Sequence, residues 1–200
     1  DKKIKLWDLS KSAADQCVAT LEGHTAPVLS LTQLTGGRLA SGSADNTIKV
    51  WDLSKAEGQQ CVATLEGHRD GVRSVTSLFD GRLASGSDDK TIKVWDLSKA
   101  ENQQCVATLT GHKELVSSVT SLADGRLAAG TYDGAIQVRD LSHTDNHSVT
   151  TLKGHDNWVP AVTSLFDGRL ASSSRDKKIK LWDLSKSAAD QCVATLEGHT

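Results

Sequence analysis

The chain has 200 residues, of which 38% are hydrophobic and only 4% aromatic, so its core must be filled mainly by aliphatic side chains. The formal net charge of −2 argues against a nucleic-acid-binding surface, and no apolar run approaches the roughly 18 residues of a membrane-spanning helix. No apolar secretory leader follows Asp1. These features predict a cytoplasmic protein without nucleic-acid or membrane partners.

A repeat of 43 or 44 residues dominates the sequence. Gly-His pairs recur at positions 23–24, 67–68, 111–112, 154–155 and 198–199. Trp-Asp pairs recur at 7–8, 51–52, 95–96 and 182–183, and Arg139-Asp140 occupies the remaining equivalent position. Residues 16–59 and 60–103 differ at only 11 of 44 positions, which indicates one structural unit that has been copied.

Each unit contains four short segments that we predict to be β-strands. In the first unit these are residues 16–21, 28–34, 38–43 and 47–52. The second and third segments are joined by Gly36-Gly37, or by Asp-Gly in the later units, which is a strong hairpin signal. Four strands joined by short turns predict an antiparallel meander. Since one meander is marginally stable alone, we expect the copies to stack.

The pattern Gly-His followed by Leu-Ala-Ser-Gly-Ser-x-Asp-x-Thr-Ile-Lys-Val-Trp-Asp, seen at residues 23–24 and 39–52, resembles the WD-repeat family. The resemblance covers the whole chain. It implies an all-β protein, a β-propeller built of four-stranded antiparallel WD-repeat blades around a central channel. The implied blades span about residues 27–65, 71–109, 115–152 and 158–196, with a half-blade at residues 1–22.

Three units carry a His–Ser–Asp combination that invites two interpretations. The members are His24, Ser41 and Asp45; His68, Ser85 and Asp89; and His155, Ser172 and Asp176. A hydrolase triad is one interpretation, but three equivalent active sites without a distinct pocket argue against it. The resemblance implies instead hydrogen-bonded structural tetrads completed by Trp51, Trp95 and Trp182. We therefore predict no catalytic residues.

The third unit departs from this pattern. His112 and Asp133 are present, but Ala129 replaces the serine and Arg139 replaces the tryptophan. We expect this blade to be the least firmly held and Arg139 to reach outward.

The cysteines and the remaining histidines suggest neither a metal nor a cofactor. Cys17, Cys61, Cys105 and Cys192 occupy the same strand position in successive units, a blade width apart, which is too far for a disulfide. No Cys-x-x-Cys pair is present for zinc. We expect half-buried free thiols in a reducing compartment. His143 and His147 lie in a divergent loop, where a solvated turn is favoured over a metal site.

Positions that differ between otherwise near-identical units point to a partner-binding surface. The candidates are Arg73, Asp88, Tyr132, Trp158 and Arg175, which fall in or beside loops expected at one end of the blades. Neutral drift on exposed loops would produce the same variation. The loops of the opposite face, such as residues 55–57, are more uniform. The favoured function is a non-catalytic scaffold that binds a protein or peptide; the alternative is a self-assembling structural unit.

Residues 1–25 are identical to residues 176–200. The unpaired half-blade would expose strand edges, so we expect no closed monomer. Two chains together hold eight full blades, and a homodimer that closes an eight-bladed ring is the simplest product. The competing explanation is that the chain is a fragment of a longer array, consistent with its lack of an initiator methionine.

Overall fold

The computed structural model describes residues 2–142 and 149–199, and the all-β fold expected from the sequence is confirmed. A two-stranded sheet pairs β1 (Ile4–Trp7) with β2 (Cys17–Leu21). The first four-stranded sheet contains β3 (Val28–Gln33), β4 (Arg38–Ser43), β5 (Ile48–Asp52) and β6 (Cys61–Leu65). The second contains β7 (Val72–Ser77), β8 (Leu83–Ser87), β9 (Ile92–Trp95) and β10 (Cys105–Leu109).

Two further four-stranded sheets follow along the chain. One contains β11 (Val116–Ser121), β12 (Arg126–Thr131), β13 (Ile136–Asp140) and β14 (Val149–Leu152). The other contains β15 (Ala161–Ser164), β16 (Leu170–Ser173), β17 (Ile179–Trp182) and β18 (Cys192–Leu196). Each sheet is an antiparallel meander in chain order, and we call each one a blade.

Short turns dictate this up-and-down order. A single 3-10 turn, η1 (Thr35–Gly37), joins β3 to β4, and both Gly36 and Gly37 have a φ of 73°. The corresponding turn between β7 and β8 places Gly81 at a φ of 85°. Glycine adopts this left-handed conformation without a Cβ clash, which explains its position in these turns. No helix in the described ranges is long and apolar enough to cross a membrane.

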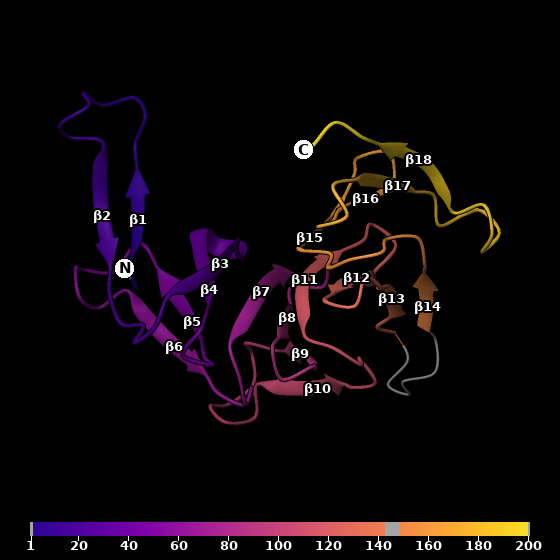
Figure 1. Cartoon of the computed structure of the whole chain (residues 1–200). Helices are drawn as coiled ribbons and strands as arrows, with labels where there is room; N and C mark the ends of the chain where they lie inside the picture. Colours follow the sequence, from indigo (N-terminus) through magenta and orange to yellow (C-terminus); the bar gives the residue numbers. More distant parts are fainter. Residues whose placement is uncertain (1, 143–148, 200) are drawn as a thin grey trace.

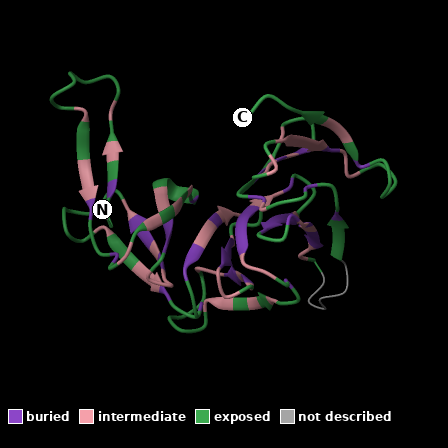
Figure 2. Ribbon diagram, in the orientation of Figure 1, coloured by how far each residue is buried: buried purple, intermediate pink, exposed green. Residues whose placement is uncertain are grey.

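The blades follow one another along an open arc (Figure 1). The β1–β2 hairpin lies at one end of the arc and β15–β18 at the other, and the two form separate sheets. Buried residues concentrate in the middle blades, whereas the two ends of the arc are more exposed (Figure 2). The blades of this chain do not close into a ring, and each blade has the expected four-stranded form.

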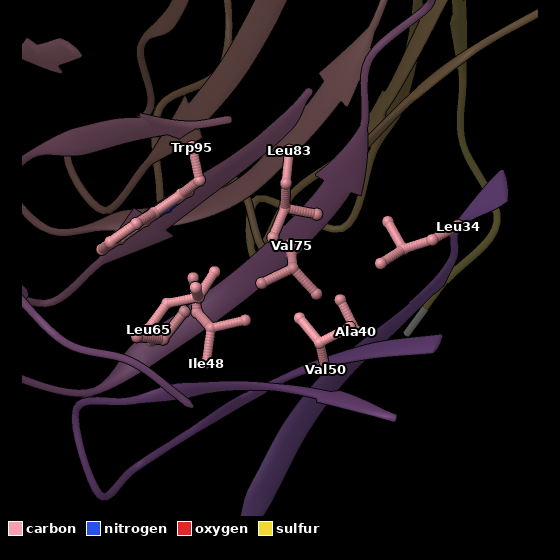
Figure 3. Packing of buried hydrophobic residues seen from close by; sticks show 9 residues of the cluster. Leu34, Ala40, Ile48, Val50, Leu65, Val75, Leu83 and Trp95 are labelled. Atoms are coloured by element: carbon pink, nitrogen blue, oxygen red, sulfur yellow. The ribbon is translucent and has the colours of Figure 1, made fainter. Parts of the chain in front are cut away.

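The core lies between consecutive blades. Ile48 and Leu65 of one blade pack with Trp95 of the next in a single buried cluster (Figure 3). Nearer the inner strands, the blades approach through a glycine: a Cβ at Gly86 would lie 2.6 Å from Cγ1 of Val116 in the following blade. Gly42 and Gly130 make equivalent approaches to the valines of the next blades. A small residue at this position lets the sheets stack at close distance.

This close approach makes a testable prediction. Gly86→Ala should destabilise the fold by ~1–2 kcal/mol, because the added methyl overpacks the contact with Val116 and outweighs the entropic benefit of alanine. Ser173 occupies the same position in the last blade, opposite Ile179, where no following blade is described. Ser173→Ala is the comparison variant: it adds no Cβ and should shift the urea midpoint much less than Gly86→Ala does. Equal losses would contradict this account of the blade contact.

Candidate functional site

The His, Ser, Asp and Trp side chains identified in the sequence meet at one end of three blades. In the second blade, His68 Nδ1 lies 2.7 Å from an Asp89 carboxylate oxygen and Nε2 lies 2.7 Å from Ser85 Oγ. The Trp95 indole N–H donates to the same Oγ over 2.8 Å. The first blade repeats this with His24, Ser41, Asp45 and Trp51, and the last with His155, Ser172, Asp176 and Trp182.

The pKa of Asp89 fixes the direction of the hydrogen bonds. Burial would raise this pKa, but donation from the Thr91 hydroxyl, the Arg69 backbone N–H and His68 lowers it to about 2. The ionised carboxylate therefore accepts the proton on His68 Nδ1. Burial lowers the pKa of His68 against the opposing effect of Asp89 and favours neutral imidazole, so Nε2 is free to accept from Ser85.

The result is a directed chain in which Trp95 donates to Ser85, Ser85 to His68, and His68 to Asp89. Ser85 is completely buried, and its oxygen already accepts the indole N–H. A hydroxyl in this position satisfies buried polar groups and ties strand to loop. It is not presented to a substrate carbonyl.

The second group of side chains identified by variation lies on the loops at the same end of the blades. The Tyr132 and Trp158 rings are 5.5 Å apart between centroids, and Arg175 Cζ lies 4.4 Å from the Trp158 ring centroid. We call these three residues the Trp158 cluster. Tyr132 comes from the β12–β13 turn, Trp158 from the loop before β15, and Arg175 from the β16–β17 turn. The cluster therefore bridges two adjacent blades.

Trp158 carries a buried indole N–H that has no hydrogen-bond partner in the described part of the chain. Tyr132 and Arg175, which pack against its ring, are both exposed side chains. A buried unpaired donor costs roughly 1–3 kcal/mol. An acceptor brought within hydrogen-bond distance would satisfy this donor.

Arg73 and Asp88 form a separate feature in the blade β7–β10. Arg73 Nε donates to both carboxylate oxygens of Asp88, at 2.8 and 2.9 Å. This hydrogen bond raises the pKa of Arg73 against the opposing effect of burial. The five variable residues thus divide into an aromatic cluster and an ion pair on different blades, and the ion pair is already internally satisfied.

Comparison with known families agrees with this geometry. The family model described as "WD domain, G-beta repeat" matches residues 15–52, 59–96, 103–140 and 146–183. The chain belongs to the WD-repeat family. WD repeats form propeller-type scaffolds for protein interactions, and this coarse function applies to the chain. A search of curated proteins finds no relative that matches it.

The third WD repeat departs from its neighbours in a way that corrects one prediction. Arg139 does not reach outward: its side chain is buried, and Nη2 donates to the Thr110 carbonyl over 2.7 Å and to Gln137 over 3.0 Å. Its guanidinium lies beside Gly111, where the other WD repeats place the edge of the tryptophan ring beside the equivalent glycine. The hydrophobic stem and the nearby carbonyl make this inward position favourable.

His112 has lost the partners that its equivalents retain. Both of its ring nitrogens are buried without a hydrogen-bond partner among the described residues, because Ala129 offers no hydroxyl. Asp133 accepts instead from the Thr131 hydroxyl and from the Ala135 backbone. Burial, assisted by the charge of Arg139, lowers the pKa of His112 to about 4.

The cysteines provide a second correction. Cys17, Cys61 and Cys192 are exposed rather than half-buried, and only Cys105 is intermediate. They lie on the outer strands β2, β6, β10 and β18, and Cys105 packs against the buried cluster of Ile48, Leu65 and Trp95. All four are free thiols. Across residues 2–142 and 149–199, no group of three His, Cys, Asp or Glu side chains is placed to hold a metal. His143 and His147 lie outside the described residues.

Sequence reasoning also missed a feature of the opposite face. Phe79 and Phe166 are exposed in the turns between the first two strands of their blades, at the end away from the His loops. The equivalent residues in the other two blades are Thr35 and Ala123. The variation between repeats could have revealed this difference. The opposite face is therefore less uniform than expected.

The tetrads lead to a comparison between two mutants. His68→Ala should destabilise the fold by ~1–3 kcal/mol, because it leaves Asp89 and Ser85 without a buried partner. His112→Ala should lower the free energy of unfolding by clearly less than His68→Ala does, since the ring nitrogens of His112 make no hydrogen bond to any described residue. Urea unfolding of both mutants measures the difference. Equal losses would show that the hydrogen bonds of the tetrad contribute little.

The lowered pKa of His112 predicts a pH dependence. Because its folded pKa of about 4 lies below the ordinary value of 6.5, the unfolded chain takes up this proton first as the pH falls. The contribution of neutral His112 to the free energy of unfolding is fully present above pH 6.5. It is lost as the pH falls from 6.5 to 4, which lowers the free energy of unfolding by on the order of 3 kcal/mol. His112→Phe should flatten the dependence of unfolding free energy on pH in that window. An unchanged slope would contradict the assignment.

Proposed function

We propose that this WD-repeat chain is a non-catalytic scaffold that binds a protein or peptide on its loop face, with the Trp158 cluster as the main contact. The loop face is the end of the blades that carries the His loops and the turns of Tyr132 and Arg175. The single observation that carries the proposal is the unpartnered indole N–H of Trp158, whose ring packs against two exposed side chains. Tyrosine, tryptophan and arginine are also the residues most often found to dominate binding energy.

The chemistry of the cluster indicates what a partner must offer. An apolar group can pack against the aromatic rings, while a carbonyl or carboxylate oxygen accepts from Trp158 Nε1. Arg175 already lies over the ring, so its charge adds attraction for a carboxylate without further ordering. A peptide segment supplies both an apolar side chain and a carbonyl acceptor. Arg73 and Asp88 would contribute to the rim, because their charges are already paired with each other.

A non-catalytic role is part of the same proposal. The arrangement of Ser85, His68 and Asp89 has the hydrogen-bond order of a hydrolase triad, but the hydroxyl is buried and occupied by Trp95. The same set recurs in three blades, which is expected of a hydrogen-bonded structural element that every repeat needs. We also propose a reducing, cytoplasmic location, with which the four free thiols are compatible.

Binding to a displayed peptide library tests the loop face directly. Peptides selected on the wild-type chain should lose affinity at least about tenfold on the Tyr132→Ala/Trp158→Ala double mutant, because both ring contacts and the N–H are removed. Circular dichroism should be unchanged. The matched control is Phe79→Ala/Phe166→Ala, which deletes two exposed aromatics from the opposite face. Peptides that depend on the control pair instead would move the binding site to that face.

Self-assembly is a second candidate function, favoured by the identity of residues 1–25 and 176–200. The open arc leaves both of its ends without a neighbouring blade (Figure 1). We propose that two copies of the 200-residue chain join into a homodimer, with an eight-bladed ring as the simplest closed product. The competing arrangement, in which further blades of a longer array complete the ring, uses the same blade surfaces.

A further inference from the structure

One contact recurs between consecutive blades of this chain, except between the second and third blades, where Arg139 replaces the tryptophan. An isoleucine and a leucine from the last two strands of one blade, the Ile–Leu pair, pack with the tryptophan of the next blade. Ile48 and Leu65 pack with Trp95, and Ile136 and Leu152 pack with Trp182. The β1–β2 hairpin follows the same rule, since Ile4 and Leu21 pack with Trp51.

The hairpin β17–β18 has the same sequence as β1–β2 and the same strand register, but its Ile–Leu pair is uncovered. Ile179 pairs with Leu196 as Ile4 pairs with Leu21. Leu196 is nevertheless 49% exposed, whereas Leu21 is 1% exposed. The two hairpins differ in their neighbours: Leu21 has the blade β3–β6 against it, whereas β17 pairs with β16 and no following blade lies against Leu196 in the described chain. The surface that buries this pair is therefore known, and it belongs to β3–β6.

The blade β3–β6 is in turn only half covered. Leu31 on its inner strand is 50% exposed, although the equivalent Val75 and Val119 are buried at 4% and 5%. Those valines are covered by the inner strands of the preceding blade, and the two-stranded β1–β2 sheet has no such strands. A complete blade in the place of β1–β2 would cover Leu31 as well.

We propose that the face of the blade β15–β18 that carries Ile179 and Leu196 docks onto the blade β3–β6 of a second copy, where β17–β18 takes the place of β1–β2. The exchange keeps the contact with Trp51, because identical residues make it. It adds the inner strands β15 and β16 over Leu31, so the docked state buries apolar surface that each separate chain exposes. This inference rests on the self-assembly proposed above and assigns its surfaces.

Two residues of β15–β18 make this contact weaker than the contacts within the chain. Ser173 replaces the glycine of Gly42, Gly86 and Gly130, whose added Cβ would lie 2.6–2.8 Å from a valine methyl of the next blade. Ala161 replaces Ser30, Ser74 and Ser118, whose hydroxyls accept a backbone N–H of the next blade at 3.0–3.1 Å. Restoring both residues should tighten the docking.

The test is the mass of the 200-residue chain in solution, measured by light scattering over a range of concentrations. The wild type should form a species of twice 21.3 kDa. Leu31→Asp should weaken dimerisation at least about tenfold, because the carboxylate is tolerated on the exposed surface of the separate chain but buried on docking. Val62→Asp is the matched control: Val62 is similarly exposed, but on the outer strand β6, and should leave the dimer intact.

A mutant that should strengthen dimerisation is also needed, because a mutant that loses dimerisation could simply have failed to fold. Ala161→Ser/Ser173→Gly should strengthen dimerisation several-fold. A wild-type and double-mutant chain that both stay at 21.3 kDa would overturn self-assembly itself. A dimer that is unaffected by both Leu31→Asp and the double mutant would overturn only the surfaces assigned here. The Tyr132→Ala/Trp158→Ala variant should not change the mass, so peptide binding and docking are judged separately.

Discussion

Each blade has two apolar faces and too few residues to hide either of them, so the contact between consecutive blades controls the rest of the structure. The Ile–Leu pair packs with the next tryptophan where the next blade has one, and the inner-strand glycine approaches the next valine. Both contacts require the same register in every sheet, because a one-residue shift would turn these side chains to the wrong face. The regular stacking then places every His loop and every turn of the second and third strands at one end of the array.

The tetrads depend on this stacking and complete it. The tryptophan that packs with the preceding blade is also the one that donates to the buried serine. A single indole thus serves an apolar contact on its face and a polar contact at its nitrogen. The third WD repeat shows that the two roles can be separated: Arg139 fills the space beside Gly111 and bonds a carbonyl, while His112 is left with buried nitrogens. In this repeat Arg139 still fills the space beside Gly111, but the hydrogen bonds that link histidine, serine and tryptophan in the other repeats are lost.

Much of this could be predicted from the sequence because the repeats specify it several times over. Strand positions and the members of the tetrads follow from spacing that recurs in each unit, and the hairpin turns follow from Gly36-Gly37 and Asp-Gly. The errors occurred at single residues whose direction depends on neighbours. Arg139 was expected to point outward, but its guanidinium donates to the Thr110 carbonyl inside. The exposure of Cys61 was missed because the strand order alone does not say how far a neighbouring blade covers the outer strand.

The loop face contains a cluster that could not be predicted from the sequence, although its three residues could be. Variation between repeats identified Tyr132, Trp158 and Arg175 individually, yet nothing in their separate positions indicated that they touch. They meet because the turn of one blade lies beside the loop that precedes the next, so the cluster is a product of stacking rather than of any repeat alone.

The duplicated hairpin also shows that neighbouring blades, and not the local sequence, decide which side chains are buried. Trp7 is 57% exposed and Trp182 1% exposed, while their leucines show the opposite difference. The hairpin forms from its own residues in both places, because its register is the same. Its burial differs because its neighbours differ: β17–β18 has β16 beside it and the blade β11–β14 before it, whereas β1–β2 has the blade β3–β6 after it. The same dependence on neighbours must hold for any surface that this array builds between two blades.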